Sequence, residues 1–185
     1  MDEMLDATLI WDGPVLFEKL FVEHGLSYQR VPASAIGAPF MPLPKSKVMI
    51  IPTGFANPQY TGILGGIKTN KSFFDRFVRG GGVLVVHGAL VPEYTYSWLP
   101  FTLKYREEYG PVDITVVNDH GCRCIIDCER VECDGYFTEA DCDVVLNGNG
   151  KPVLVAKEHG SGVIVATTIH EFPTGAFLKW AVAHG

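Results

Sequence analysis

The sequence predicts an α/β protein with three layers, in which helices cover both faces of a mostly parallel central sheet. In the first half of the chain, short apolar runs alternate with amphipathic segments, which is typical of parallel strands joined by helices. In the second half, apolar runs are separated by short glycine-containing turns, which favour antiparallel hairpin strands. The chain has 185 residues, of which 47% are hydrophobic and 19% are charged, and we expect one domain over residues 1–185.

The first half contains three apolar runs, one alternating run and two amphipathic segments, the first of which has an apolar stripe that includes Phe17 and Phe21. The first helix is expected to begin at Asp12 as its N-cap, with Pro14 in the first turn, and to end at Gly25. A second helix is predicted over residues 72–79, and a loop with a short helical turn precedes it at 54–72. Residues 38–44 are proline-rich and predict a loop. Strands are predicted at residues 7–11, 27–32, 47–53 and 83–86.

The second half predicts short strands and a closing helix. Glycine-containing turns at residues 147–150 and 159–162 are expected to join hairpin strands. The closing helix is predicted over residues 174–183, with Phe177, Trp180 and Ala181 facing inward. Strands are predicted at residues 112–117, 122–128, 143–146, 153–157 and 163–168.

Charge and hydropathy restrict the class of partner. The net charge is −6 and the isoelectric point is about 5.4, which disfavours nucleic acid and anionic membranes because both attract basic surfaces. The acidic N-terminus lacks the basic region of a signal peptide, and no apolar run has the length of a membrane helix. We therefore expect a soluble cytoplasmic protein that binds a small molecule, either alone or as a homo-oligomer.

The closing strand carries the first family resemblance. Residues 162–171 form a glycine turn, an apolar run and then His170-Glu171, and the predicted strand at 153–157 precedes them. This pattern resembles the end of class I glutamine amidotransferase domains, in which the last core strand delivers a catalytic histidine with an acid nearby. It is also similar to the ThuA-like (trehalose-utilisation) branch, which has a triple-glycine strand ending in histidine, as in residues 80–87, and a closing Trp-Ala helix, as in Trp180-Ala181. The resemblance implies a flavodoxin-like, amidotransferase-like fold.

Two departures separate this chain from a glutaminase. An amidotransferase needs a cysteine on the turn after residues 83–86, where backbone N–H groups stabilise an oxyanion. Here the turn is His87-Gly88-Ala89-Leu90, and the first cysteine of the chain is Cys122. The family places its histidine and acid two residues apart, whereas His170 and Glu171 are adjacent and on a strand would face opposite sides. We therefore expect no glutaminase activity.

The carboxyl ends of parallel strands predict the position of the pocket. His87 and His170 both follow predicted core strands, and together with Glu171 or Glu93 they form an acid–base or divalent-metal hypothesis. The alternative is that both histidines only bond loop backbone. The predicted catalytic residues are His87, His170 and Glu171, and the predicted ligand-binding residues are Asp12, Gly54, Asn57, Gly88, Ala89, Glu93, Tyr94 and Tyr136.

The cysteines are unusual in number and spacing. Four of the five lie within residues 122–133, and a strand over 122–128 would place Cys122, Cys124 and Cys128 on one face. These residues, with Cys133, are candidate metal ligands, although their spacing matches no standard zinc or iron–sulfur motif. The alternatives are buried free thiols in a reducing compartment, or a disulfide or redox pair.

Aromatic residues are concentrated after the predicted strand at 83–86. Tyr94, Tyr96, Trp98 and Phe101 either form a wall for a ligand or belong to a flap that packs on its own domain or a dimer partner. The leading hypothesis is a small-molecule-binding protein or divergent amidotransferase-like enzyme. The alternatives are a non-catalytic regulatory or assembly domain and a cysteine-ligated metal or redox protein. The sequence leaves open whether the protein is catalytic.

Overall fold

A computed structural model describes residues 4–36, 38 and 42–185. The N-terminal half contains β1 (Leu5–Ile10), α1 (Leu16–Glu23), β2 (Tyr28–Val31), α2 (Ala33–Ile36), β3 (Ser46–Ile51), α3 (Leu64–Thr69), α4 (Lys71–Arg79) and β4 (Val83–Val86). The remainder contains β5 (Glu93–Thr95), β6 (Leu103–Val116), a 3₁₀ helix (Gly121–Ile125), β7 (Arg130–Ala140), β8 (Asp143–Gly148), β9 (Lys151–His159), β10 (Gly162–Thr167) and α5 (Gly175–His184).

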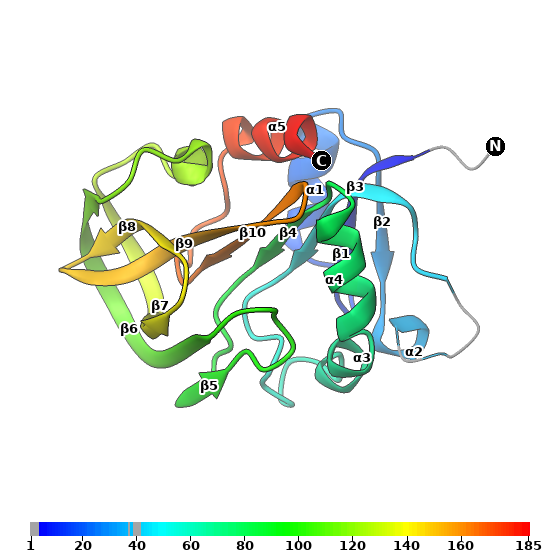
Figure 1. Cartoon of the computed structure of the whole chain (residues 1–185), viewed down its shortest axis with the longest axis horizontal. Helices are drawn as coiled ribbons and strands as arrows, with labels where there is room; N and C mark the ends of the chain where they lie inside the picture. Colours follow the sequence, from blue (N-terminus) through cyan, green and yellow to red (C-terminus); the bar gives the residue numbers. More distant parts are fainter. Residues whose placement is uncertain (1–3, 37, 39–41) are drawn as a thin grey trace.

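The strands form one mixed sheet with the order β2-β1-β3-β4-β10-β9-β8-β6-β5, and β7 pairs with β6. The pairs from β2 to β10 are parallel, and those from β10 onward are antiparallel. The predicted α/β class, with a mostly parallel core and antiparallel hairpins in the C-terminal half, is therefore confirmed. The last core strand, β10, is inserted beside β4 and joins the two parts of the sheet (Figure 1).

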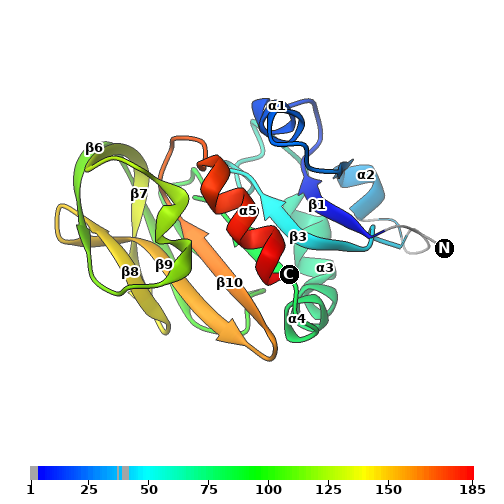
Figure 2. The ribbon, with the colours of Figure 1, turned by 90° about the horizontal axis from the view of Figure 1, so that it is seen from above.

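Helices cover both faces of the parallel core. On one face, α1 and α5 pack Phe17, Phe21 and Phe177 against alternate residues of β1, β3, β4 and β10. On the other face, α3 and α4 supply Ile67, Phe74 and Val78. Figure 2 shows α5 lying across the sheet beside β10, with the β6–β9 region extending to one side.

The core strands form because their sequences are apolar on both faces. All four residues of β4 and all six of β10 are buried, as strands covered by helices on two sides require. Helix α1 follows the predicted apolar stripe and is followed by Gly25, whose φ is +66°. The turns expected at residues 147–150 and 159–162 join antiparallel strands, as predicted.

One predicted strand is wrong, and two parts of the sheet were not predicted. Residues 122–128 do not form a strand, because His120 accepts a hydrogen bond from the backbone N–H of Cys122 and begins the 3₁₀ helix. The long hairpin of β6 and β7 was missed in most of its length, since most residues of β6 are exposed and the strand lacks an apolar run. Strand β5 was also missed. Part of the predicted loop at 38–44 lies outside the described residues.

Asp12 does not cap α1, contrary to the prediction. The N-cap is Val15, and Glu18 Oε2 accepts a hydrogen bond from its backbone N–H at 3.0 Å. The Asp12 carboxylate instead accepts hydrogen bonds from Ala33 N at 2.6 Å, Thr61 Oγ1 at 2.7 Å and Gly62 N at 2.8 Å. Asp12 therefore ties the start of α2 to the loop before α3.

Within the described residues, no helix is long and apolar enough to cross a membrane.

Replacing Asp12 with Ala should lower the free energy of unfolding by about 2–3 kcal/mol, because three donors lose a charged acceptor. Burial alone would raise the pKa of Asp12, but hydrogen bonds from Thr61, Gly62 and Ala33 outweigh it and lower the pKa below 3.8. The stabilisation by the Asp12 carboxylate is therefore complete above pH 3.8. The difference in stability between the wild type and Asp12→Ala should shrink as the pH falls below this value. Urea unfolding at pH 7 and pH 3 measures both effects.

The matched control is Glu23→Ala, which removes an exposed pair with Lys19 at 3.8 Å and should change stability by less than about 0.5 kcal/mol. An Asp12 variant as stable as this control would contradict the assigned role.

Candidate functional site

A pocket of about 890 Å³ lies at the carboxyl ends of the core strands. Trp11 follows β1, Pro52 and Thr53 follow β3, and His87 follows β4, so parallel strands bring these residues to one edge. Helix α1 and the segment after β10 complete the walls. The lining consists of Trp11, Pro14, Val15, Leu16, Phe17, Pro52, Thr53, His87, His170, Glu171 and Phe172.

His87 is buried in the wall of this pocket and is only 3% exposed. Its backbone N–H and its ring Nδ1 both lie within hydrogen-bond distance of the carbonyl oxygen of Ile51, at 3.0 and 3.1 Å. A carbonyl only accepts hydrogen bonds, so we assign the ring proton to Nδ1. Nε2 then carries a lone pair, and among the described residues it has no hydrogen-bond partner.

Burial keeps the His87 ring neutral. Loss of hydration lowers the pKa of His87 to about 4, and the hydrogen bond to Ile51 opposes this shift only in part. The imidazole is therefore an uncharged acceptor at neutral pH. Such a group accepts a hydrogen bond from a ligand, or acts as a general base when the ligand can lose a proton.

The rest of the pocket is mainly apolar and aromatic. The ring of Phe17 contacts those of His87 and Phe172 edge-on, with centroid distances of 5.5 and 5.2 Å. Phe172 and Leu16 stay 45% and 65% exposed at the rim. No Lys or Arg is among the lining residues, and Glu171 is the only carboxylate.

His170 and Glu171 reach the same pocket in different ways. The backbone N–H of His170 donates to the carbonyl of Glu132 on β7 at 2.8 Å, and its exposed ring contacts Tyr109 edge-on at 5.7 Å. Glu171 Oε1 accepts a hydrogen bond from the backbone N–H of Glu132 at 2.7 Å. The Glu171 carboxylate thus bonds β7, and within the described residues it makes no hydrogen bond to His170.

The predicted catalytic residues His87, His170 and Glu171 all line the pocket, whereas the predicted ligand-binding residues lie outside its lining. Gly54 N donates to Gly88 O at 2.8 Å, and Asn57 Nδ2 donates to Leu90 O at 2.8 Å, so these loops bond each other. Asp12 accepts hydrogen bonds from Thr61 and the backbone, and Ala89 is buried in the core. Glu93 forms an ion pair with Arg106, and the Tyr94 hydroxyl accepts a hydrogen bond from Trp98. The ammonium group of Lys151 lies over the ring of Tyr136.

The aromatic segment after β4 packs on its own domain. Tyr96, Trp98 and Phe101 are buried in the core on the α3–α4 face, where the ring centroid of Phe55 lies 5.6 Å from that of Tyr96 and 6.0 Å from that of Trp98. Of the alternatives for this segment, the structure therefore supports a flap packed on its own domain, and not a ligand wall.

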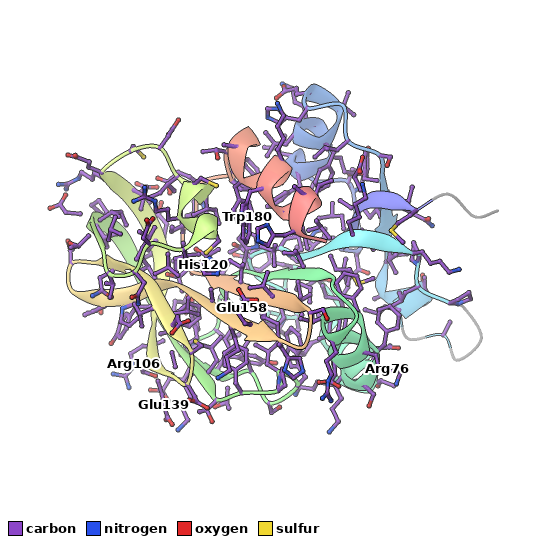
Figure 3. All side chains as sticks on the ribbon, turned by 45° about the horizontal axis from the view of Figure 1, so that its top comes forward. Arg76, Arg106, His120, Glu139, Glu158 and Trp180 are labelled. Carbon is purple, nitrogen blue, oxygen red and sulfur yellow. The ribbon has the colours of Figure 1, made fainter. Side chains whose placement is uncertain are left out.

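The cysteines do not converge. Cys122 and Cys124 lie in the 3₁₀ helix, exposed Cys128 follows it, and buried Cys133 lies on β7. Cys122 Sγ is 3.0 Å from His120 Nδ1, and His120 Nε2 is 3.3 Å from Glu158 Oε1, beside Trp180 (Figure 3). No three His, Cys, Asp or Glu side chains within the described ranges are grouped to hold a metal, so the four-cysteine metal hypothesis receives no support.

Sequence reasoning missed several residues of the site. Trp11 and Thr53 follow the core strands β1 and β3, so the strand-end argument was sufficient to find them. Phe17 was placed on the apolar stripe of α1, whose first turn forms one wall. Asp134, which does not line the pocket, was given no role in the sequence analysis. No local sequence pattern predicted that β7 would place it beside the end of β10.

The fold is shared with several solved structures. The chain superimposes on a glutamine amidotransferase from Thermotoga maritima with a TM-score of 0.59 and 14% identity, covering 91% of this chain and 76% of that one. It superimposes on a ThuA-like protein from Bacteroides uniformis with a TM-score of 0.53 and 11% identity, covering 97% and 89%. The predicted amidotransferase-like, ThuA-like architecture is therefore confirmed at the level of the fold.

A longer protein contains the same architecture as one part. The chain matches a β-galactosidase from Bacillus circulans with a TM-score of 0.57 and 14% identity, over 97% of its own length but only 30% of the enzyme's. At this identity the likeness concerns the fold alone. The sequence matches no protein-family model and no curated protein.

Replacing His87 with Gln should change the dependence of stability on pH. The folded-state pKa of His87 is about 4 and its ordinary value is 6.5, so protons bind the unfolded chain first as pH falls through this window. From pH 7 to pH 5 the wild type should lose about 2 kcal/mol more than the variant. Urea unfolding at both pH values measures this difference. Equal losses in the two proteins would contradict a buried neutral His87.

Proposed function

We propose that this chain is an amidotransferase-like domain, residues 1–185, that binds a neutral small molecule in the pocket beside His87. One observation carries the proposal. A neutral imidazole whose Nε2 has no partner among the described residues lies in the wall of a mainly apolar pocket, at the strand ends where α/β sheets bind ligands.

The lining favours a particular ligand chemistry. Trp11, Phe17 and Phe172 offer aromatic surface to an apolar face of the ligand. His87 Nε2 accepts a hydrogen bond, so the ligand needs an O–H or N–H group on the side that faces it. A phosphate or carboxylate would meet no Lys or Arg among the described residues of the lining, while Glu171 contributes a carboxylate.

Glutaminase activity is not part of this function. Its nucleophile would follow β4, where the chain has His87-Gly88-Ala89 and no cysteine. If the protein is an enzyme, His87 is placed to remove a proton from the ligand hydroxyl it binds. His170 and Glu171 then belong to the rim. A cytoplasmic location fits the five cysteines, all of which are free thiols in the structure.

Benzyl alcohol tests the proposal because it combines an aromatic ring with one neutral hydroxyl. It should bind more tightly than toluene by about 5-fold, since the hydroxyl adds one hydrogen bond of about 1 kcal/mol. Benzoate should not bind. Titrations followed by NMR should move the resonances of the Trp11 indole and the His87 ring.

The variant His87→Leu should remove the preference for benzyl alcohol over toluene, whereas His184→Gln, on the exposed end of α5, should retain it. Binding of benzoate as strong as that of benzyl alcohol would overturn the proposed ligand class. If none of the three compounds binds, the alternative of a non-catalytic regulatory or assembly domain becomes the better account.

A further inference from the structure

Residues 169–172, which follow β10, form one side of the mouth of the pocket and are held in place by β7. Ile169 pairs with Cys133 in an isolated antiparallel bridge, and the backbone N–H of His170 donates to the carbonyl of Glu132 at 2.8 Å. The last three residues of this segment line the pocket. Pairing with β7 therefore fixes the position of the backbone that carries them.

The same strand orients the carboxylate of Glu171. Its Oε1 accepts a hydrogen bond from the backbone N–H of Glu132 at 2.7 Å, so this oxygen is directed at β7. Among the described residues, Oε2 of Glu171 accepts no hydrogen bond, and the carboxylate forms no ion pair. One oxygen is therefore held by the protein, and the other is available to accept a hydrogen bond at the mouth of the pocket.

The carboxylate of Glu132 does not compete for this role. Its Oε2 accepts a hydrogen bond from the hydroxyl of Tyr109 on β6, and Glu132 is not among the lining residues. The ring of Tyr109 also contacts that of His170 edge-on, at a centroid distance of 5.7 Å. Glu171 thus supplies the one carboxylate in the described lining.

The pocket offers hydrogen-bond acceptors at two depths. His87 is buried in the wall, and its Nε2 has no partner among the described residues, whereas Glu171 is exposed at the rim. Trp11, Phe17 and Phe172 supply aromatic surface in the same lining, around a space of about 890 Å³. A ligand that displaces water from both acceptors must replace the lost hydrogen bonds, so it gains from a donor at each end.

We propose that Glu171 determines specificity and that the ligand is a neutral molecule with an apolar ring and an O–H or N–H donor at each end. The inner donor bonds His87 Nε2, and the outer donor bonds Glu171 Oε2. Because a carboxylate only accepts hydrogen bonds, an ether or carbonyl oxygen at the outer end is disfavoured. This inference rests on the proposed function and adds a second recognition point to the same pocket.

Two compounds that differ in one donor test the inference. The diol para-benzenedimethanol has a hydroxyl at each end of an aromatic ring, and its monomethyl ether has only one. The diol should bind the wild type at least about 3-fold more tightly, because the outer oxygen of the ether has no hydrogen to give to Glu171. Dissociation constants from NMR titrations of the full-length protein measure the difference. Equal affinities for the two compounds overturn the inference.

The variant Glu171→Gln separates recognition from a structural role. Its amide oxygen can still accept from the backbone N–H of Glu132, which turns the amide NH₂ group toward the ligand. An NH₂ group donates equally to a hydroxyl or an ether oxygen, so the preference for the diol should disappear. A carboxylate that only linked the rim to β7 would leave the preference unchanged, because the amide keeps that link. A preference that survives this substitution therefore overturns the inference.

Glu139→Gln is the matched control and should keep the preference for the diol. Glu139 is exposed on β7, where it pairs with Lys104 at 2.6 Å (Figure 3). Loss of the preference in this control as well would contradict a specific role for Glu171. If His87→Leu shows the expected loss for benzyl alcohol but the wild type does not prefer the diol, this inference alone fails. If the diol preference depends on Glu171 but benzyl alcohol binding does not depend on His87, the proposed function alone fails.

Discussion

The carbonyl of Ile51 is the group on which the geometry of the site depends. Ile51 is the last residue of β3, and its carbonyl oxygen accepts hydrogen bonds from both the backbone N–H and the ring of His87. This oxygen therefore fixes both the start of the turn after β4 and the orientation of the imidazole. Because the same hydrogen bond places the ring proton on Nδ1, the other ring nitrogen, Nε2, is a hydrogen-bond acceptor. A backbone atom therefore sets which nitrogen of His87 is the hydrogen-bond acceptor.

The antiparallel half of the sheet also contacts the segment that follows the parallel strand β10. Strand β6 pairs with β8 through its last residues and with β7 along most of its length, and β7 in turn reaches the end of β10. This route brings Tyr105 and Asp134 together and places Asp134 against Gly88, the residue after His87. The site thus depends on contacts between segments far apart in the chain, since β7 also bonds His170 and Glu171 through Glu132.

The sequence was sufficient for the parallel core and insufficient for the long hairpin. Core strands such as β4 and β10 are buried on both faces, so their apolar runs mark them directly. Strand β6 carries exposed charges over much of its length, and its pairing with β7 is specified by tertiary contacts that no local pattern reveals. Strand ends therefore located His87 and His170, while Asp134 required knowledge of the register of β7.

The close approach of Gly88 to Asp134 also constrains how this chain can change. In the glutaminase pattern a cysteine follows the strand that corresponds to β4, but a side chain at position 88 would collide with the Asp134 carboxyl, 2.2 Å from its Cβ. Position 89 is buried and faces the core. A cysteine at position 88 would therefore require that Asp134 be moved or replaced, so a nucleophile at this turn needs a change in β7 as well as in the turn.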